Sequence, residues 1–111
     1  MLDRSKFNNT ADQLKDNLLE VKLLALTKRK SHRINSDTGF LMLQKKSAGR
    51  YQTVSQEKIP VEISISANRW PFFSTFRFAS GGSIVLENED HSTKVVVSPI
   101  GLIRQTVVEK K

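Results

Sequence analysis

Apolar side chains recur at helical spacing in the first third of the chain. They repeat every three to four residues, as one face of an amphipathic α-helix does. Thr10 and Gln13 have the spacing of a capping box, in which each side chain binds the other residue's backbone amide. We therefore expect a helix over residues 10–33, preceded by a flexible segment at residues 1–9. The residues expected to pack this helix are Leu14, Leu18, Val21 and Ala25, which follow helical spacing together with Ala11. Its apolar face is widened by Leu19, Leu23, Leu24 and Leu26.

The chain from residue 38 to residue 111 changes to short apolar runs separated by turn residues. Such runs are typical of antiparallel strands. A hairpin turn is expected at residues 48–50, where Ala-Gly-Arg interrupts two such runs. The strands expected here cover residues 40–43, 51–54, 59–65 and 72–78.

Residues 80–104 predict three further strands from their turn residues. Gly81 and Gly82 open the first strand, a polar turn at residues 87–92 follows it, and Ser-Pro-Ile-Gly at residues 98–101 leads into the third strand. Roughly seven strands thus follow one helix without βαβ alternation. The pattern predicts a single α+β domain, residues 1–111, with the helix packed on antiparallel sheet.

Aromatic residues gather in residues 70–78, interleaved with Arg69 and Arg77. Sheets that bind single-stranded nucleic acid combine exposed aromatic and basic side chains in this way. Strand periodicity instead places Phe72, Phe76 and Phe78 on one face, which favours a core role for them. Trp70 and Phe73 would then be the exposed aromatic residues.

Known catalytic and metal-binding motifs are absent from these 111 residues. There is no cysteine, and the two histidines, His32 and His91, stand in polar, surface-like settings. Glu87, Glu89 and Asp90 beside His91 suit a solvated hairpin tip better than a metal site. We expect no catalytic residue, no metal and no cofactor, and therefore no enzyme.

The net charge of +7 favours anionic partners, although solubility would also account for it. Part of this charge lies in a basic run at residues 28–33. Cations at a helix C-terminus oppose the negative end of the helix dipole, which is a sufficient structural reason for the run. The functional alternative is a phosphate-binding patch.

A leading helix with a basic end is followed by strands and by two characteristic C-terminal segments. These segments are Gly81-Gly82-Ser83-Ile84-Val85-Leu86 and Lys94-Val95-Val96-Val97-Ser98-Pro99-Ile100-Gly101-Leu102-Ile103-Arg104. In this combination the chain resembles the GspH/FimT family, which comprises minor type IV pilins and type II secretion pseudopilins.

The resemblance implies a type IV pilin-like fold and a non-enzymatic role as a fibre subunit. Its partners would be other pilin or pseudopilin subunits, contacted through helix leucines and sheet edges. Residues 10–33 would be the second half of a longer helix. The hydrophobic first half would lie upstream and anchor the protein in the inner membrane, with the globular domain in the periplasm or extracytoplasmic space.

Some DNA-uptake members of the family are similar in carrying a C-terminal Gly-Arg-x-Arg motif. Here the matching positions read Gly101-Leu102-Ile103-Arg104, with Leu102 in place of the first arginine, which favours a structural role. The alternative remains a DNA-binding minor pilin. Its site would consist of Arg104, Lys94, Lys110 and Lys111, with Lys28, Arg29, Lys30 and Arg33 as a second patch.

A further alternative is a soluble cytosolic nucleic-acid-binding module whose true start is Met1. No apolar run in this chain approaches the ~18–20 residues of a membrane span, and its first residues do not form a signal peptide. The sequence thus leaves a cytosolic protein and a membrane-anchored one both open.

Overall fold

A computed structural model describes residues 2–37, 39–74 and 80–111 of the chain. In these residues one helix, α1 (Leu2–Lys28), precedes nine strands. The strands are β1 (His32–Asp37), β2 (Phe40–Ser47), β3 (Arg50–Lys58), β4 (Ser64–Ala67), β5 (Phe72–Phe73), β6 (Gly82–Glu87), β7 (His91–Val97), β8 (Ile103–Gln105) and β9 (Glu109–Lys110).

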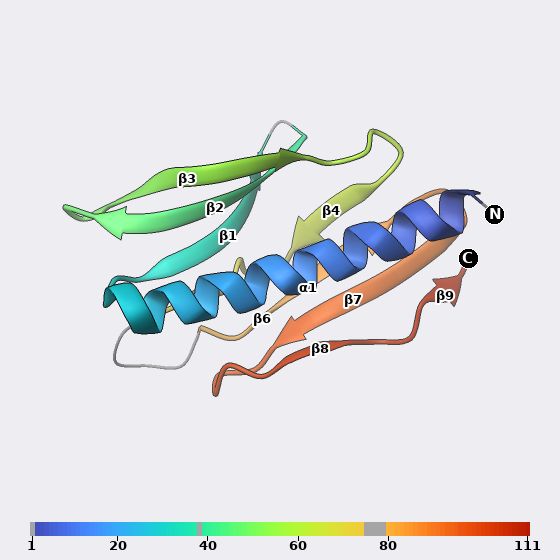
Figure 1. Cartoon of the computed structure of the whole chain (residues 1–111). Helices are drawn as coiled ribbons and strands as arrows, with labels where there is room; N and C mark the ends of the chain where they lie inside the picture. Colours follow the sequence, from blue (N-terminus) through green and yellow to red (C-terminus); the bar gives the residue numbers. More distant parts are fainter. Residues whose placement is uncertain (1, 38, 75–79) are drawn as a thin grey trace.

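The strands form two antiparallel sheets that share the helix. The first sheet has the order β3-β2-β1-β5, and the second has the order β4-β6-β7-β8, with β9 also paired to β7. The helix contacts β1 and β5 of the first sheet and β7 and β8 of the second, so it lies across both (Figure 1). The α+β prediction with antiparallel sheet is confirmed. The extra strands are β1, which lies in the predicted helix end and turn, and the two-residue β9.

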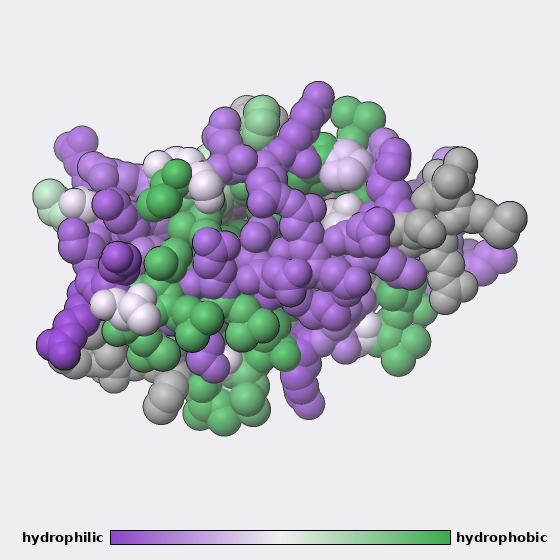
Figure 2. All heavy atoms as spheres, viewed as in Figure 1, coloured by the Kyte–Doolittle hydropathy of each residue, from purple (hydrophilic) through white to green (hydrophobic). Residues whose placement is uncertain are grey.

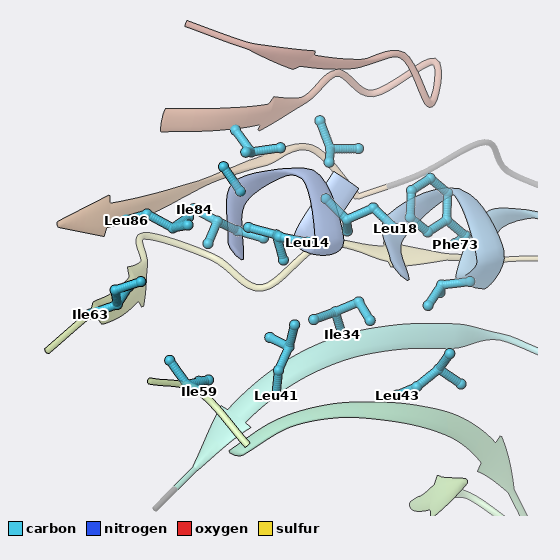
Figure 3. Packing of buried hydrophobic residues seen from close by; sticks show 14 of the residues in the cluster. Leu14, Leu18, Ile34, Leu41, Leu43, Ile59, Ile63, Phe73, Ile84 and Leu86 are labelled. Atoms are coloured by element: carbon cyan, nitrogen blue, oxygen red, sulfur yellow. The ribbon is translucent and has the colours of Figure 1, made fainter. Parts of the chain in front are cut away.

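The core lies between α1 and the two sheets. Leu14 and Leu18 project from the helix between Ile34 and Leu43 of the first sheet and Ile84 and Leu86 of the second (Figure 3). Burial of each such side chain contributes about 1.5–3 kcal/mol. The fully buried helix residues are Phe7, Ala11, Leu14, Leu18, Val21 and Ala25.

The helix begins earlier than the capping-box pattern indicates. Residues 1–9 were expected to be flexible, but α1 starts at Leu2, and Phe7 is fully buried one turn before Ala11. Thr10 is not an N-cap, because its hydroxyl donates a hydrogen bond to the Lys6 carbonyl inside the helix, at 2.9 Å. Burial of Phe7 explains the extension, because tertiary packing supplies most of a helix's stability.

The helix also ends earlier than predicted, at Lys28 rather than residue 33. Arg29 adopts a left-handed backbone conformation with φ of 54°, which stops the helix as a C′ residue does. His32 and Ile34 then follow with the period of a strand, and both are buried on the helix-facing side of β1. The basic run is therefore divided between the helix end, a short connection and β1.

The two histidines do not lie on the surface, contrary to the sequence-based expectation. His32 is only 2% exposed. Half-buried His91 stacks at a tilt beside Phe7, with 5.9 Å between the ring centroids. His32 lies two residues before buried Ile34 on β1, and His91 lies two residues before buried Thr93 on β7. Because residues two apart share one face of a strand, both rings lie on the inner faces of the sheets.

The hairpin turn at residues 48–50 is confirmed, and the strands around it are longer than predicted. Ser47 pairs with Arg50, and the two residues between them, Ala48 and Gly49, both have positive φ. Residues 59–65, in contrast, do not form one strand. The Ile63 amide donates to the Pro60 carbonyl at 3.0 Å, so a turn brings both Ile59 and Ile63 into the core.

The exposure predicted for Phe72 and Phe73 is wrong. Phe73 is 1% exposed and packs in the core, whereas Phe72 is 38% exposed. Pairing of Phe73 with inward-facing His32 fixes this orientation. Trp70, predicted to be exposed, is half-buried and packs against the core. Phe76, Arg77 and Phe78 lie outside the described residues.

The three C-terminal strands are confirmed as β6, β7 and β8. The Asn88 side-chain oxygen accepts hydrogen bonds from the amides of Asp90 and His91 and so shapes the β6–β7 turn. The Gly101 amide donates to the Ser98 carbonyl at 2.9 Å in the β7–β8 turn. Glu89 and Asp90 are exposed at a hairpin tip, as predicted.

Candidate interaction surfaces

One flank of α1 remains apolar and exposed. Leu19, Leu23 and Leu26 are 50%, 58% and 55% exposed, although they follow one another at helical spacing. Exposed Ile100 and Leu102 lie in the nearby β7–β8 turn, which the Lys22 ammonium reaches by donating to the Gly101 carbonyl at 3.0 Å. We call these five residues the leucine flank. Figure 2 shows apolar residues gathered over the C-terminal half of α1 and below it.

The residues predicted for fibre and helix packing lie on the buried side of α1 and not on the leucine flank. Leu14, Leu18, Val21 and Ala25 are at most 1% exposed and pack on the chain's own sheets. They account for the attachment of α1 to the two sheets. Of the leucines that widen the stripe in the sequence, Leu19, Leu23 and Leu26 form the exposed surface, whereas Leu24 packs against the core.

The eight cations predicted for DNA binding do not gather at one place. Lys28, Arg29 and Lys30 are exposed at the C-terminal end of α1. Lys110 and Lys111 lie at the C-terminal end of the chain, beside the N-terminal end of α1 (Figure 1). The 27 residues of α1 span about 40 Å between these ends.

Lys94 and Arg104 form a separate pair on the outer face of the second sheet. Arg104 pairs with Val96, which shares a face of β7 with Lys94. Lys110 pairs instead with His91, five residues along β7 from Val96, or ~17 Å away. The ammonium of Lys111 lies 3.0 Å from the Glu87 carboxylate.

Arg33 is held within the first sheet. Its guanidinium stacks over the Tyr51 ring at 3.9 Å from the centroid, and its Nε donates to the Gln44 side-chain oxygen at 2.8 Å. Partial burial raises the pKa of Tyr51, an effect that the Arg33 charge opposes. These contacts reduce the freedom of Arg33 to reach an external phosphate.

Sequence reasoning missed the basic residues of the β2–β3 hairpin, Lys45, Lys46 and Arg50. The Lys46 amide donates to the Ser31 carbonyl at 2.8 Å, which brings β2 beside the basic end of α1. The sequence signal was present in Gln44-Lys45-Lys46, but only strand pairing shows that Lys45 lies on the same side of the first sheet as Lys28 and Lys30. The described residues contain no cluster of three acidic or histidine side chains that could hold a metal ion.

No helix in the described part of the chain is both long and apolar enough to cross a membrane.

Comparison with known proteins identifies the fold of the chain but finds no protein of similar sequence. No protein-family model matches the sequence, and no curated protein matches it. Two solved structures of the minor pseudopilin EpsH from the type II secretion system of Vibrio cholerae are similar in fold, each with a TM-score of 0.77. One is 13% identical and covers 91% of this chain and 96% of its own; the other is 12% identical and covers 96% and 97%. With its N-terminal helix packed on antiparallel sheets, the chain has the pilin-like fold of a minor pseudopilin.

Proposed function

We propose that the chain is a minor pseudopilin or minor pilin, a structural subunit that joins a type II secretion pseudopilus or a type IV pilus through protein–protein contacts. The observation that carries the proposal is the leucine flank on a helix of pilin-like fold. Exposed apolar patches rimmed by polar residues mark protein interaction sites. Burial of three leucines against another subunit would contribute several kcal/mol at about 1.5–3 kcal/mol each for full burial.

The proposed role includes membrane attachment through a segment upstream of α1. The N-terminal end of α1 lies at one end of the molecule, so an upstream helix would extend along the same axis without crossing either sheet (Figure 1). Such a subunit would be anchored in the inner membrane, with this domain in the periplasm. The likeness to a structural subunit also supports a non-enzymatic role, and the fold favours this location over a cytosolic nucleic-acid-binding module.

The fibre contact can be tested by site-specific crosslinking in the source cells. The chain contains no cysteine, so Leu23→Cys introduces a single reactive thiol on the leucine flank. Exposed Glu20, about 60° further round the helix, provides the matched control as Glu20→Cys. We expect a thiol crosslinker to join the Leu23→Cys protein to a second pilin-like subunit, identified by mass spectrometry, and to leave the Glu20→Cys protein largely free.

Introducing negative charge on the leucine flank tests whether the flank is needed for incorporation into the fibre. Leu19→Asp with Leu23→Asp should remove the subunit from sheared fibre fractions while the circular dichroism spectrum stays unchanged, because both side chains are exposed. Normal incorporation of this variant, with no crosslink at Leu23→Cys, would show that the leucine flank is not a fibre contact.

A further inference from the structure

A pocket of about 320 Å³ opens between the C-terminal turn of α1 and the inner face of the first sheet. It lies on the flank of the helix away from Leu19 and Leu26, toward β1, β2 and β3. Its volume is at the lower end of the range of pockets that bind small ligands. The pocket is lined by Leu24, Lys28, Lys30, His32, Lys45 and Val54.

The apolar part of the lining comes from Leu24 and Val54. Val54 has no partner in β2, because Leu43 pairs with Ser55 and Gln44 pairs with Thr53, leaving a β-bulge. Bulges reorient side chains and are frequent beside functional sites. The bulge directs Val54 to the helix-facing side, where it lines the pocket and remains 53% exposed.

The polar part of the lining carries only positive charge. Lys28, Lys30 and Lys45 surround the apolar residues, and no acidic residue lines the pocket. Among the described residues, no carboxylate lies within ion-pair distance of these three ammonium groups. The rim therefore offers three cations that no carboxylate of the described residues neutralises, around an apolar floor.

The walls of the pocket are held together by hydrogen bonds. Buried His32 donates from Nδ1 to the Lys30 carbonyl, with 2.7 Å between the atoms. The neighbouring Ser31 carbonyl accepts from the Lys46 amide at 2.8 Å. These contacts join the connection that follows α1 to β1 and β2, and so hold one wall of the pocket in place.

We propose that this pocket binds an acidic segment of a partner protein, one that inserts a large apolar side chain and places carboxylates beside it. The apolar side chain would lie against Leu24 and Val54, and the carboxylates would pair with Lys28, Lys30 and Lys45. Nucleic acid fits less well, because a phosphate backbone would use the lysines and leave the apolar floor unfilled. The site is separate from the leucine flank, since Leu24 points about 100° away from Leu23.

The test is a nuclear magnetic resonance titration of the chain with a defined probe. The probe is the peptide acetyl-Asp-Glu-Asp-Phe-Glu-Asp-amide, and the comparison peptide has serine in place of phenylalanine. We expect the probe to shift the methyl signals of Leu24 and Val54 and the ring signals of His32. These shifts should reach a plateau as the concentration of the probe rises. Loss of the buried phenyl ring should weaken binding by at least about tenfold.

Protein variants separate the two parts of the site. Lys28→Gln with Lys30→Gln should weaken the probe at least about tenfold, because two charge-assisted contacts are lost. Lys94→Gln with Lys110→Gln removes the same charge elsewhere and should leave binding nearly unchanged. Val54→Ser should weaken the probe, whereas Val61→Ser, at an exposed site outside this pocket, should not.

Two results would overturn the proposal. Equal binding of the two peptides would show that charge alone acts and that the apolar floor takes no part. An oligothymidylate of equal charge that shifts the same methyl signals as strongly as the probe would assign the site to nucleic acid. Neither result depends on whether the leucine flank joins a fibre.

Discussion

Ala48 occupies a backbone position that residues with a Cβ rarely adopt. Its φ is 52°, and Gly49 beside it has φ of 80°, so both central residues of the two-residue hairpin are left-handed. Such a turn favours Asn-Gly, and a left-handed alanine costs roughly 1–2 kcal/mol. Ala48→Asn should therefore raise the free energy of unfolding by about 0.5–1 kcal/mol, measured by urea denaturation. Gly49→Ala should lower it, and an Ala48→Asn midpoint at or below that of the parent chain would contradict the turn assignment.

Gly82 lies where the backbone of another segment leaves no room for a side chain. A Cβ at this position would overlap the Arg69 carbonyl oxygen, which belongs to the main chain and cannot rotate away. Gly82→Ala should thus destabilise the fold by about 1–3 kcal/mol in urea denaturation. Gly81→Ala is the matched control, because its new Cβ would meet Pro99 and Val97 at 3.3 Å and needs only a small shift. Equal stability of the two variants would argue against close packing of β6 on Arg69.

At this scale, sequence reasoning failed where too few residues define a pattern. Phe72 and Phe73 form a strand of only two residues, so periodicity could not decide which ring points inward. Pairing with β1 determines which ring points inward, because Phe73 lies opposite inward-facing His32. His32 itself was misread because it stands within a basic run, although its alternation with Ile34 was visible in the sequence.

At the scale of elements, α1 divides adjacent leucines between two roles. Leu18 is fully buried, whereas Leu19 is half exposed on the leucine flank. Leu18→Ala should cost about 2–5 kcal/mol of unfolding free energy, because it leaves a cavity between the sheets. Leu19→Ala should change stability by less than about 1 kcal/mol, since surface substitutions have small effects. Similar losses for the two variants, measured by thermal or urea denaturation, would contradict this division.

The attachment of α1 to the turn before β4 should depend on pH. The Lys6 ammonium lies 2.6 Å from the Glu62 carboxylate, and its hydrogen bond lowers the pKa of Glu62 from the ordinary value of 4.5. A lowered carboxyl pKa stabilises the fold above the ordinary value, and the effect is lost as the pH falls through the lowered pKa. We expect an NMR titration to find Glu62 below 4.5.

Lys6→Gln provides the control for this contact, because it removes the charge and keeps a polar side chain. The Glu62 pKa should then move back toward its ordinary value, and the acid-side loss of stability should become smaller. An unchanged Glu62 titration in Lys6→Gln would mean that Lys6 is not the cause of the shift. The effect on stability should be small, since both side chains are exposed.

Elements were predicted well where the determining chemistry is local. The strands β6, β7 and β8 follow from the Asn88 turn and the Ser-Pro-Ile-Gly turn, whose hydrogen bonds join residues close in sequence. The start of α1 was missed because it depends on Phe7 packing beside His91 of β7, a contact across most of the chain. A capping box at Thr10 could not reveal that contact.

At the scale of the whole molecule, the core between the helix and the sheets was predictable from the sequence, whereas the interaction surfaces of the molecule were not. The apolar stripe indicated that the helix would pack on sheet, as Leu14 and Leu18 do. The lysine-rimmed pocket instead needs α1, β1, β2 and β3 together, with a bulge that directs Val54 toward the helix. Neither strand order nor the bulge can be derived from the alternation of side chains.

The distribution of charge leads to a prediction about DNA. The cations that share a face of the second sheet, Lys94 and Arg104, can contact about two phosphates, so they should contribute about −2 to the slope of log K for duplex DNA against log salt. Binding at this face should accordingly be weak and independent of sequence. Fluorescence anisotropy of a short labelled duplex over a range of sodium chloride concentrations would measure the slope.

Paired variants show which cations act. Lys94→Gln with Arg104→Gln should flatten the salt dependence, whereas Lys110→Gln with Lys111→Gln should leave it nearly unchanged, because the Lys111 ammonium already pairs with Glu87. A slope steeper than about −4 would require several more phosphate contacts than one pair of cations can make. If the Lys110 and Lys111 variant also reduced that slope, the C-terminal cations would act as one continuous track along β7, and a DNA-binding minor pilin would become the better description of this chain.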